Sequence, residues 1–293
     1  MIKYSIIIPH HNVPTLLERC VNSIPQRDDI QVIIVDDNSV NNDTYLEKYA
    51  FLQRKNLIFV PTFEGRGAGY ARNVALTKAE GKWLLFADAD DFFVSNFLDL
   101  LDEYYDTQAD VVYFNIKSVF SDDITKEGGR DKAKQKLFDD YHTNRDDNLF
   151  RLNYPEPWGK MVRHEMVKKH HIKFDETRVA NDYYFSTQVG CLARTIQVVD
   201  KPLYIVTLRP NSLSYGYGDT KEKLLTRIDV GIRVYHFRKK LGYDVTPIPI
   251  RGLMVLLLKH HPMTFLKELF VLPFEGIPVH TLLVQIFSKK YMK

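Results

Sequence analysis

The sequence predicts an α/β protein with a mostly parallel central sheet, helices on both faces of that sheet, and a helical carboxyl-terminal region. Three observations support this fold class. Short apolar runs alternate with segments of helical periodicity over the first third of the chain, which is typical of parallel sheets. Polar clusters follow several of these runs, where ligands of such sheets bind. Beyond that third the alternation weakens, which indicates a smaller second lobe.

The strands and helices of the first lobe follow from two different patterns. Continuous apolar runs predict strands that are buried on both faces. These runs are residues 5–9, 31–35, 57–60, 83–86 and 111–114. Apolar residues at helical spacing predict the helices between the strands. The predicted helices are residues 15–24, 42–54, 65–79 and 96–105.

The rest of the chain is divided less clearly. Residues 121–136 are polar and carry two glycines within a charge run, which predicts a mobile insertion or loop. We expect the second lobe to cover 116–215 and the helical region to cover 216–293. Within that last region, the pattern predicts a helix over 220–241.

Composition excludes some classes of partner and favours others. The formal net charge is only +3, and no basic stripe interleaves with aromatic residues, so we expect no nucleic-acid partner. Two cysteines far apart, Cys20 and Cys191, favour a reducing compartment. The first apolar run ends at Pro9, and no run is long enough to span a bilayer. These features predict a cytoplasmic protein.

The last fifty residues combine apolar runs with lysine, arginine and histidine. This combination suits peripheral contact with an anionic membrane surface, such as the inner face of the cell membrane. It suits an ordinary helical cap on the second lobe equally well.

Three carboxylates, Asp88, Asp90 and Asp91, follow the predicted strand 83–86. Neighbouring carboxylates repel one another unless a cation neutralises them, and Mg²⁺ typically takes one or two carboxylates together with substrate phosphates. A helix amino terminus explains Asp91 or one neighbour without any metal. The full cluster favours a divalent-metal site.

Two further clusters lie at predicted strand ends. Asp36 and Asp37 form either a turn with a cap or a carboxylate pair that accepts hydrogen bonds from a uracil-type base or a ribose. The glycines of 65–69 lack the lysine and hydroxyl residue of a P-loop and follow the third strand, which argues against a dinucleotide fingerprint. Backbone N–H groups there, with Arg72, could approach a diphosphate.

A candidate general base lies further along the chain. Asn181 and Asp182 precede an apparent helix, and Asn181 suits the role of its cap. A sugar hydroxyl that attacks an anomeric carbon needs a carboxylate within hydrogen-bond reach. Asp182 is therefore the candidate for that carboxylate.

Taken together, these stretches resemble family 2 glycosyltransferases of the GT-A fold. Four blocks match in the family's order and spacing, and they are residues 5–12, 35–39, 69–73 and 85–91. Residues 158–161, 181–182 and 209–212 match more loosely, with Asn181 in place of the family's glutamate. The Gln-x-x-Arg-Trp motif of processive members is absent, which favours single transfer over polymer synthesis.

The resemblance implies a role for each block. It implies a nucleotide-sugar-binding lobe over 1–115 and an acceptor-binding lobe that carries the catalytic base, Asp182, over 116–215. Mn²⁺ or Mg²⁺ would be held by Asp90 and Asp88. The acceptor would contact Trp158 and Lys160, although a core position explains Trp158 equally well. The implied donor contacts are Pro9, Asn12, Asp36, Asp37, Arg72, Asp88 and Arg209.

The expected function is inverting transfer of a sugar from a nucleotide-sugar, with a UDP-sugar expected, to a hydroxyl of a carbohydrate or lipid-linked carbohydrate. Cell-surface polysaccharide or glycan synthesis is the expected context. One alternative is a sugar-phosphate nucleotidyltransferase, although such enzymes usually carry a basic, glycine-rich loop where this chain has residues 10–13. The other is a non-catalytic nucleotide-sugar-binding protein. The sequence does not indicate the sugar, the linkage or the oligomeric state.

Overall fold

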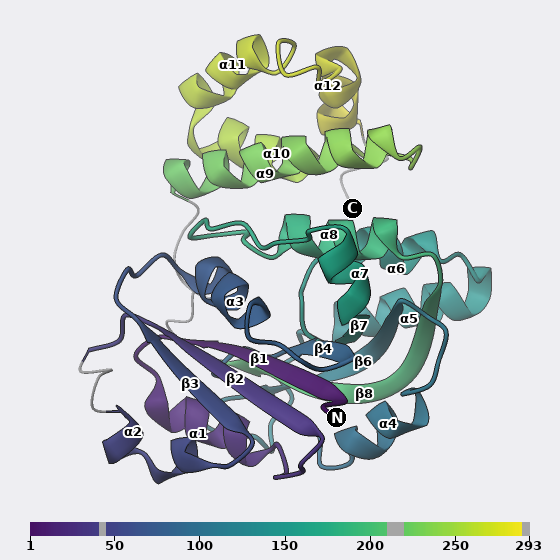
Figure 1. Cartoon of the computed structure of the whole chain (residues 1–293). Helices are drawn as coiled ribbons and strands as arrows, with labels where there is room; N and C mark the ends of the chain where they lie inside the picture. Colours follow the sequence, from purple (N-terminus) through teal and green to yellow (C-terminus); the bar gives the residue numbers. More distant parts are fainter. Residues whose placement is uncertain (41–44, 210–219, 289–293) are drawn as a thin grey trace. The chain divides into compact units, whose positions relative to one another are not determined.

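A computed structural model describes residues 1–40, 45–209 and 220–288 of the chain. The chain forms two compact units, Met1–Tyr215 and Gly216–Lys293 (Figure 1). The predicted lobes 1–115 and 116–215 both lie in the first unit, because one sheet runs through them.

The sheet of the first unit has eight strands. They are β1 Tyr4–His10, β2 Ile30–Asp37, β3 Leu57–Thr62, β4 Trp83–Phe86, β5 Phe92–Phe93, β6 Val111–Phe120, β7 Lys160–Arg163 and β8 Ile196–Leu208. Their order across the sheet is β3-β2-β1-β4-β7-β6-β8-β5. Strands β1, β2, β3 and β4 pair in parallel, as do β6 and β8. The pairs β4–β7, β6–β7 and β5–β8 are antiparallel.

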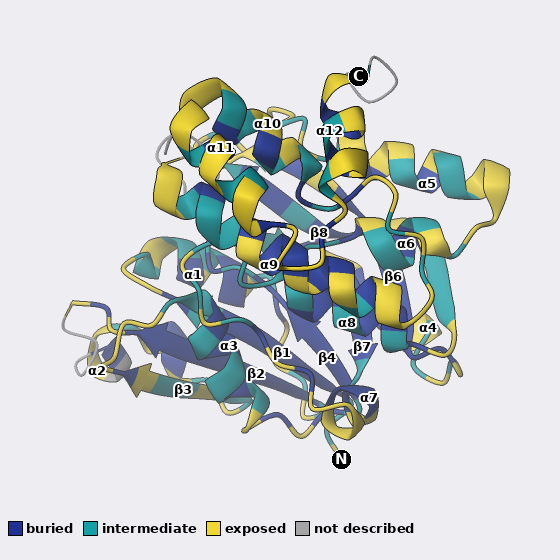
Figure 2. Ribbon diagram, turned by 90° about the horizontal axis from the view of Figure 1, so that it is seen from above, coloured by how far each residue is buried: buried dark blue, intermediate teal, exposed yellow. Residues whose placement is uncertain are grey.

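The parallel half confirms the predicted fold class. Every residue of β2 is buried, as expected of a strand that is covered on both faces. In the register of the sheet, Ile7 of β1 pairs with Ile33 on one side and Phe86 on the other. These apolar strands form the dark-blue interior of Figure 2.

Helices cover both faces of this half, with α3 and α1 on opposite sides of β1 and β2 (Figure 1). The helices of the first unit are α1 Pro14–Asn22, α2 Tyr45–Lys48, the 3₁₀ helix η2 Ala50–Gln53, α3 Ala68–Leu76, α4 Phe97–Glu103, α5 Lys132–Asn144, α6 Asn148–Asn153, α7 His164–Lys169 and α8 Tyr183–Leu192. The predicted helix 42–54 is thus two short elements in its described part, and residues 42–44 lie outside the described residues.

The structure corrects the end of the loop predicted over 121–136, since 121–131 contain no helix or named strand but 132–136 are helical. Helix α5 begins at Lys132, and its Phe138 is fully buried. Before it, the N–H of Gly128 donates to the carbonyl of Ser118 at 2.7 Å. The polar composition misled the prediction because α5 buries only one narrow face.

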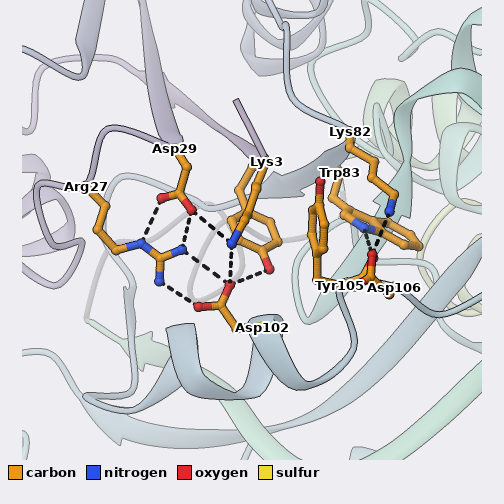
Figure 3. A network of polar contacts seen from close by, with 9 residues as sticks. Lys3, Arg27, Asp29, Lys82, Trp83, Asp102, Tyr105 and Asp106 are labelled. Atoms are coloured by element: carbon orange, nitrogen blue, oxygen red, sulfur yellow. Dashed lines mark hydrogen bonds and ion pairs between the residues drawn. The ribbon is translucent and has the colours of Figure 1, made fainter. Parts of the chain in front are cut away.

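A polar network lies at the amino-terminal ends of β1, β2 and β4 (Figure 3). Arg27 donates to Asp29 at 2.6 Å and to Asp102 of α4 at 2.7 Å. The hydrogen bond from Arg27 lowers the pKa of Asp29 to about 2. Nearby, the indole N–H of Trp83 donates to the carbonyl of Tyr105 at 3.0 Å. The network anchors α4 at the end of the sheet opposite the polar clusters.

The second unit is helical. Its helices are α9 Lys221–Lys240, α10 Arg251–His260, α11 Pro262–Val271 and α12 Val279–Phe287. Thr220 caps α9 by accepting the N–H of Lys223, as expected for a threonine at that position. The unit has its own apolar core, which includes Leu224, Met254 and Leu282. Within the described residues, none of the helices is long and apolar enough to cross a membrane.

Candidate active site

The polar clusters meet at the carboxyl ends of β1, β2 and β4. These strands are parallel neighbours, so their ends share one edge of the sheet. His10 at the end of β1 pairs in register with Asp36 of β2. Asp88 follows β4 by two residues.

Asp36 and His10 form a fully buried pair. The Nδ1 of His10 lies 2.6 Å from a carboxylate oxygen of Asp36. The N–H of Val13 donates to Nε2 of His10 at 3.1 Å, so the imidazole carries its proton on Nδ1 and donates it to Asp36. The second oxygen of Asp36 accepts the N–H of Ser39 at 2.8 Å. Asp36 therefore fixes the loops after both strands, and its predicted contact with the donor base stays a prediction.

Asp37 holds the glycine-rich loop in front of α3. Its two carboxylate oxygens accept the N–H groups of Arg66 at 3.0 Å and Gly67 at 2.7 Å. The φ angles of Gly65 and Gly67 are +62° and +91°, which glycine adopts at little cost. The glycines of this segment therefore let the loop turn back onto the carboxylate.

Asn12 links the loops after β1 and β2. Its N–H donates to the hydroxyl of Ser39 at 2.7 Å, and its side-chain oxygen accepts the N–H of Val40 at 2.9 Å. The side chain is exposed, whereas Pro9 is half-buried. Both residues thus lie at the strand-end edge where donor contacts are predicted.

Arg72 connects this edge with the segment that carries the candidate base. It projects from α3 and is only 4% exposed. One guanidinium nitrogen donates to Asp88 at 2.6 Å and another donates to the side-chain oxygen of Asn181 at 2.9 Å. The guanidinium also lies 5.2 Å from the centre of the Phe174 ring. Because Asn181 precedes Asp182, this bridge brings the two halves of the predicted site together.

Asp182 lies directly before α8 and is half-buried. Burial raises the pKa of its carboxyl, Arg72 counteracts that rise, and Asp88 adds to it. Among the described residues, its carboxylate has no hydrogen-bond partner other than its own backbone. A carboxylate with a raised pKa and no bond to another described side chain can accept a proton from a substrate.

The three acids after β4 have different environments. Asp91 is buried and accepts the N–H of Thr207 at 2.6 Å, which agrees with a structural role. Asp88 and Asp90 keep 35% and 24% of their side chains exposed. Arg209 donates to Asp90 at 3.1 Å. Burial, followed by the charge of Asp88, raises the pKa of Asp90.

A comparison with known protein families shows which family the chain belongs to. Residues 5–170 match the family model described as Glycosyl transferase family 2. The chain belongs to this family. The resemblance deduced from the four sequence blocks is therefore confirmed.

Individual members of family 2 are similar over different lengths. Uncharacterized glycosyltransferase EpsJ of Bacillus subtilis (strain 168) is 29% identical over 72% of this chain and 62% of its own length. Glycosyltransferase GlyG of Streptococcus pneumoniae serotype 4 is 25% identical over 90% of this chain and 91% of GlyG. The crystal structure of Staphylococcus aureus TarS 1–349 in complex with UDP-GlcNAc has 25% identity and a TM-score of 0.62, over 89% of this chain and 72% of that one. The chain spans 31% to 63% of three curated relatives, EpsJ among them.

Two residues expected at the acceptor are buried in this family 2 fold. Trp158 is 5% exposed and stacks on Tyr204 with ring centres 5.8 Å apart. Of the two interpretations that the sequence left open, burial favours the core position. Lys160 is 1% exposed, and its ammonium donates to the carbonyl of Tyr154 at 2.7 Å. Burial lowers the pKa of Lys160 to about 7. Either residue could touch a sugar directly only if its present packing or hydrogen bond were broken.

Strand β8 supplies site residues that sequence analysis did not predict. The N–H of Asp88 donates to the hydroxyl of the buried Tyr204 at 2.8 Å. The hydroxyl of Thr207 donates to the carbonyl of Asp90 at 2.8 Å. The short apolar stretches in residues 196–208 were the available signal, but their pairing with β6 is visible only in three dimensions.

A groove of about 570 Å³ lies between α3 and α7. Its lining includes one aromatic residue, Tyr70, and two lysines, Lys168 and Lys173. Sequence analysis did not single it out, because its walls come from segments that are distant in the sequence. The lining residues are Tyr70, Asn73, Val74, Leu76, Thr77, His164, Val167, Lys168, His171, Ile172, Lys173 and Glu176.

Proposed function

We propose that the chain transfers a sugar from a UDP-sugar to a hydroxyl of a carbohydrate or lipid-linked carbohydrate acceptor, with inversion, in cell-surface polysaccharide or glycan synthesis. Family membership supports sugar transfer, and the TarS relative that binds UDP-GlcNAc supports the choice of donor. The observation that carries the proposal is the Arg72 bridge between Asp88 and Asn181. It joins the strand-end acids to the segment that holds the carboxylate of Asp182.

In this proposal Asp182 accepts the proton of the attacking acceptor hydroxyl. Burial raises the pKa of its carboxyl, which makes the carboxylate a stronger base at neutral pH. The charge of Arg72 acts in the opposite direction and favours the ionised form that the reaction needs. Attack from the side opposite the leaving diphosphate inverts the anomeric carbon.

The two partly exposed acids, Asp88 and Asp90, fit a divalent metal. Within the described residues no three potential ligands gather at one point, but Mg²⁺ needs only one or two carboxylates when a substrate supplies phosphate oxygens. Asp90 and Asp88 would be that pair, and a bound cation would relieve the repulsion through which the charge of Asp88 raises the pKa of Asp90. Bound Mn²⁺ or Mg²⁺ would stabilise the negative charge of the leaving diphosphate. Arg209, already beside Asp90, would supply a second positive charge there.

Cys20 and Cys191 are buried and form no disulfide, which supports the cytoplasm as the compartment of the proposed reaction. A nucleotidyltransferase remains the less favoured reading, because the family match and the named relatives concern sugar transfer.

The Asp182→Asn substitution tests the proposal. Asparagine keeps the size of the side chain and still suits the position before α8, but it cannot accept the proton. We expect transfer and donor hydrolysis to fall by about 10²–10⁴-fold, while the affinity for the UDP-sugar in calorimetry stays close to that of the wild type. Initial rates over a panel of nucleotide-sugars with Mn²⁺ provide the measurement.

The matched control is Asp122→Asn, which changes an exposed aspartate outside the site. It should leave the rates unchanged. Near-normal turnover of Asp182→Asn would refute the general-base role. Consumption of UTP with a sugar phosphate, in place of a nucleotide-sugar, would favour the nucleotidyltransferase.

A further inference from the structure

Helix α11 of the second unit presents large apolar side chains to solvent. Met263 is 77% exposed, Leu266 48% and Phe270 76%, and Phe274 in the turn after the helix is 91% exposed. Soluble proteins seldom leave such a cluster uncovered without an interaction partner. We refer to these four residues as the α11 face.

The α11 face is distinct from the side of the helix that builds the core. Residues seven apart lie on nearly the same side of an α-helix. Met263 and Phe270 are such a pair and are exposed, whereas Phe265 and Leu272 are another such pair and are buried. The helix is therefore apolar on two opposite sides, and its own unit covers only one of them. The outer side appears in yellow in Figure 2.

The second unit is basic as a whole, with 13 lysines and arginines against six acids in the sequence of residues 216–293. Lys267 is exposed on α11 itself, and Lys259 and His260 are exposed at the end of α10. The acidic residues near this face are Glu268, which is half-buried, Glu275, which is exposed, and Asp229 of α9, whose charge acts on Glu268. Residues 251–293 contain six lysines and arginines against two acids. Three of those lysines, at 289, 290 and 293, lie outside the described residues.

We propose that the α11 face docks on an anionic lipid surface. Phenylalanine, methionine and leucine would enter the boundary between headgroups and acyl chains, and the lysines would contact anionic headgroups. Lysine can lie beside an apolar face in this setting because its stem is apolar and its ammonium reaches the headgroups. A self-association interface is less well matched, because lysine is depleted at the core of protein interfaces. A membrane surface is where a lipid-linked acceptor would be presented.

Vesicle co-sedimentation of the full chain tests this surface, using phosphatidylcholine vesicles with and without phosphatidylglycerol. We expect the wild type to sediment with the anionic vesicles and to be released at high salt. The double variant Phe270→Ser, Phe274→Ser should lose most of this binding, since it removes two rings that are open to solvent. Lys267→Glu should weaken it about fivefold or more, from the loss of one headgroup contact and the added repulsion.

The matched controls are Ile124→Ser and Lys55→Glu, which change exposed residues of the first unit and should bind like the wild type. Circular dichroism verifies that the variants fold, and donor hydrolysis, which needs no membrane, shows separately whether the proposed chemistry holds. Equal sedimentation of the double variant and the wild type would overturn the proposal. So would a wild type that does not bind vesicles but forms a dimer that the double variant lacks in size-exclusion chromatography.

Discussion

At the scale of single residues, Arg72 links the two parts of the candidate site. It is buried, it donates to Asp88 and Asn181, and its charge acts on Asp182. Sequence analysis placed Arg72 near a diphosphate on the basis of its position on a helix. The structure shows contacts with residues 16 and 109 positions away, which local sequence cannot indicate. The predicted diphosphate contact remains a prediction.

We predict that Arg72→Met shifts the acid limb of the kcat/KM profile to higher pH. The base must be deprotonated to act, and burial raises the pKa of Asp182 while Arg72 lowers it. Removal of the guanidinium takes away the larger of the two influences that lower this pKa, so activity is lost at a higher pH as the solution is acidified. The turnover should also fall, by up to about 100-fold, because Asn181 and Asp182 lose their anchor.

Arg72→Lys is the comparison, measured over the same pH series. Lysine keeps the positive charge but cannot donate to two partners in the same fixed geometry. The acid limb should then stay near that of the wild type while the turnover falls. An unshifted limb in Arg72→Met would show that Asp182 is not the titrating base.

At the scale of elements, the site depends on a close approach between α3 and the segment before α8. A side chain on Gly69 of α3 would place its Cβ 1.9 Å from the backbone oxygen of Asp175 and 3.0 Å from the Cβ of Asn181. The helix therefore packs on the segment backbone to backbone. Hydrogen bonds between Asn73 and the backbone of Phe174 secure the same approach.

We predict that Gly69→Ala destabilises the first unit by about 1–3 kcal/mol, because the added methyl group must push the two backbones apart. It should also reduce turnover, since Asn181 moves with the segment. Urea unfolding followed by far-ultraviolet circular dichroism measures the first effect, and donor hydrolysis measures the second. Gly252→Ala in α10 is the control, because its Cβ would meet nothing within 4 Å. Equal stability of the two variants would contradict the packing argument.

The elements that were predicted are specified by the local sequence, whereas the elements that were missed depend on contacts with residues distant in the sequence. The runs at 5–9 and 31–35 correspond to β1 and β2, because a buried parallel strand is apolar throughout its length. Strands β7 and β8 were not predicted, since each is recognised by its pairing with β6, a strand distant in sequence. The candidate site shows the same division. The acids at strand ends were predicted from local pattern, whereas the roles of Tyr204 and the burial of Lys160 follow from packing.

At the scale of the whole molecule, two apolar cores lie in separate units. Trp83 and Trp158, the two tryptophans of the sequence, both lie in the first unit. Their fluorescence therefore reports on the unit that carries the candidate site. Stabilisation of that unit by a ligand can be measured without a signal from tryptophans of the helical unit.

We predict that UDP and Mn²⁺ together raise the thermal stability of the first unit, by about 2.7 kcal/mol at 100 times the dissociation constant. Either ligand alone should give much less, because Asp88 and Asp90 need phosphate oxygens to complete a metal site. Tryptophan fluorescence during thermal unfolding measures the effect, with Asp90→Asn as the variant that should lose it. Full stabilisation by UDP in the presence of EDTA would refute the metal role.

The continuous sheet has a consequence for protein engineering. Because β7 is hydrogen-bonded to β4 on one edge and β6 on the other, a hybrid joined at residue 115 would put strands of two parents side by side inside one sheet. The side chains that meet across the neighbouring strands of the two parents would then have to pack together. A hybrid joined between residues 215 and 216 leaves all eight strands with their native neighbours. Recombination among relatives is therefore better tolerated at the later junction.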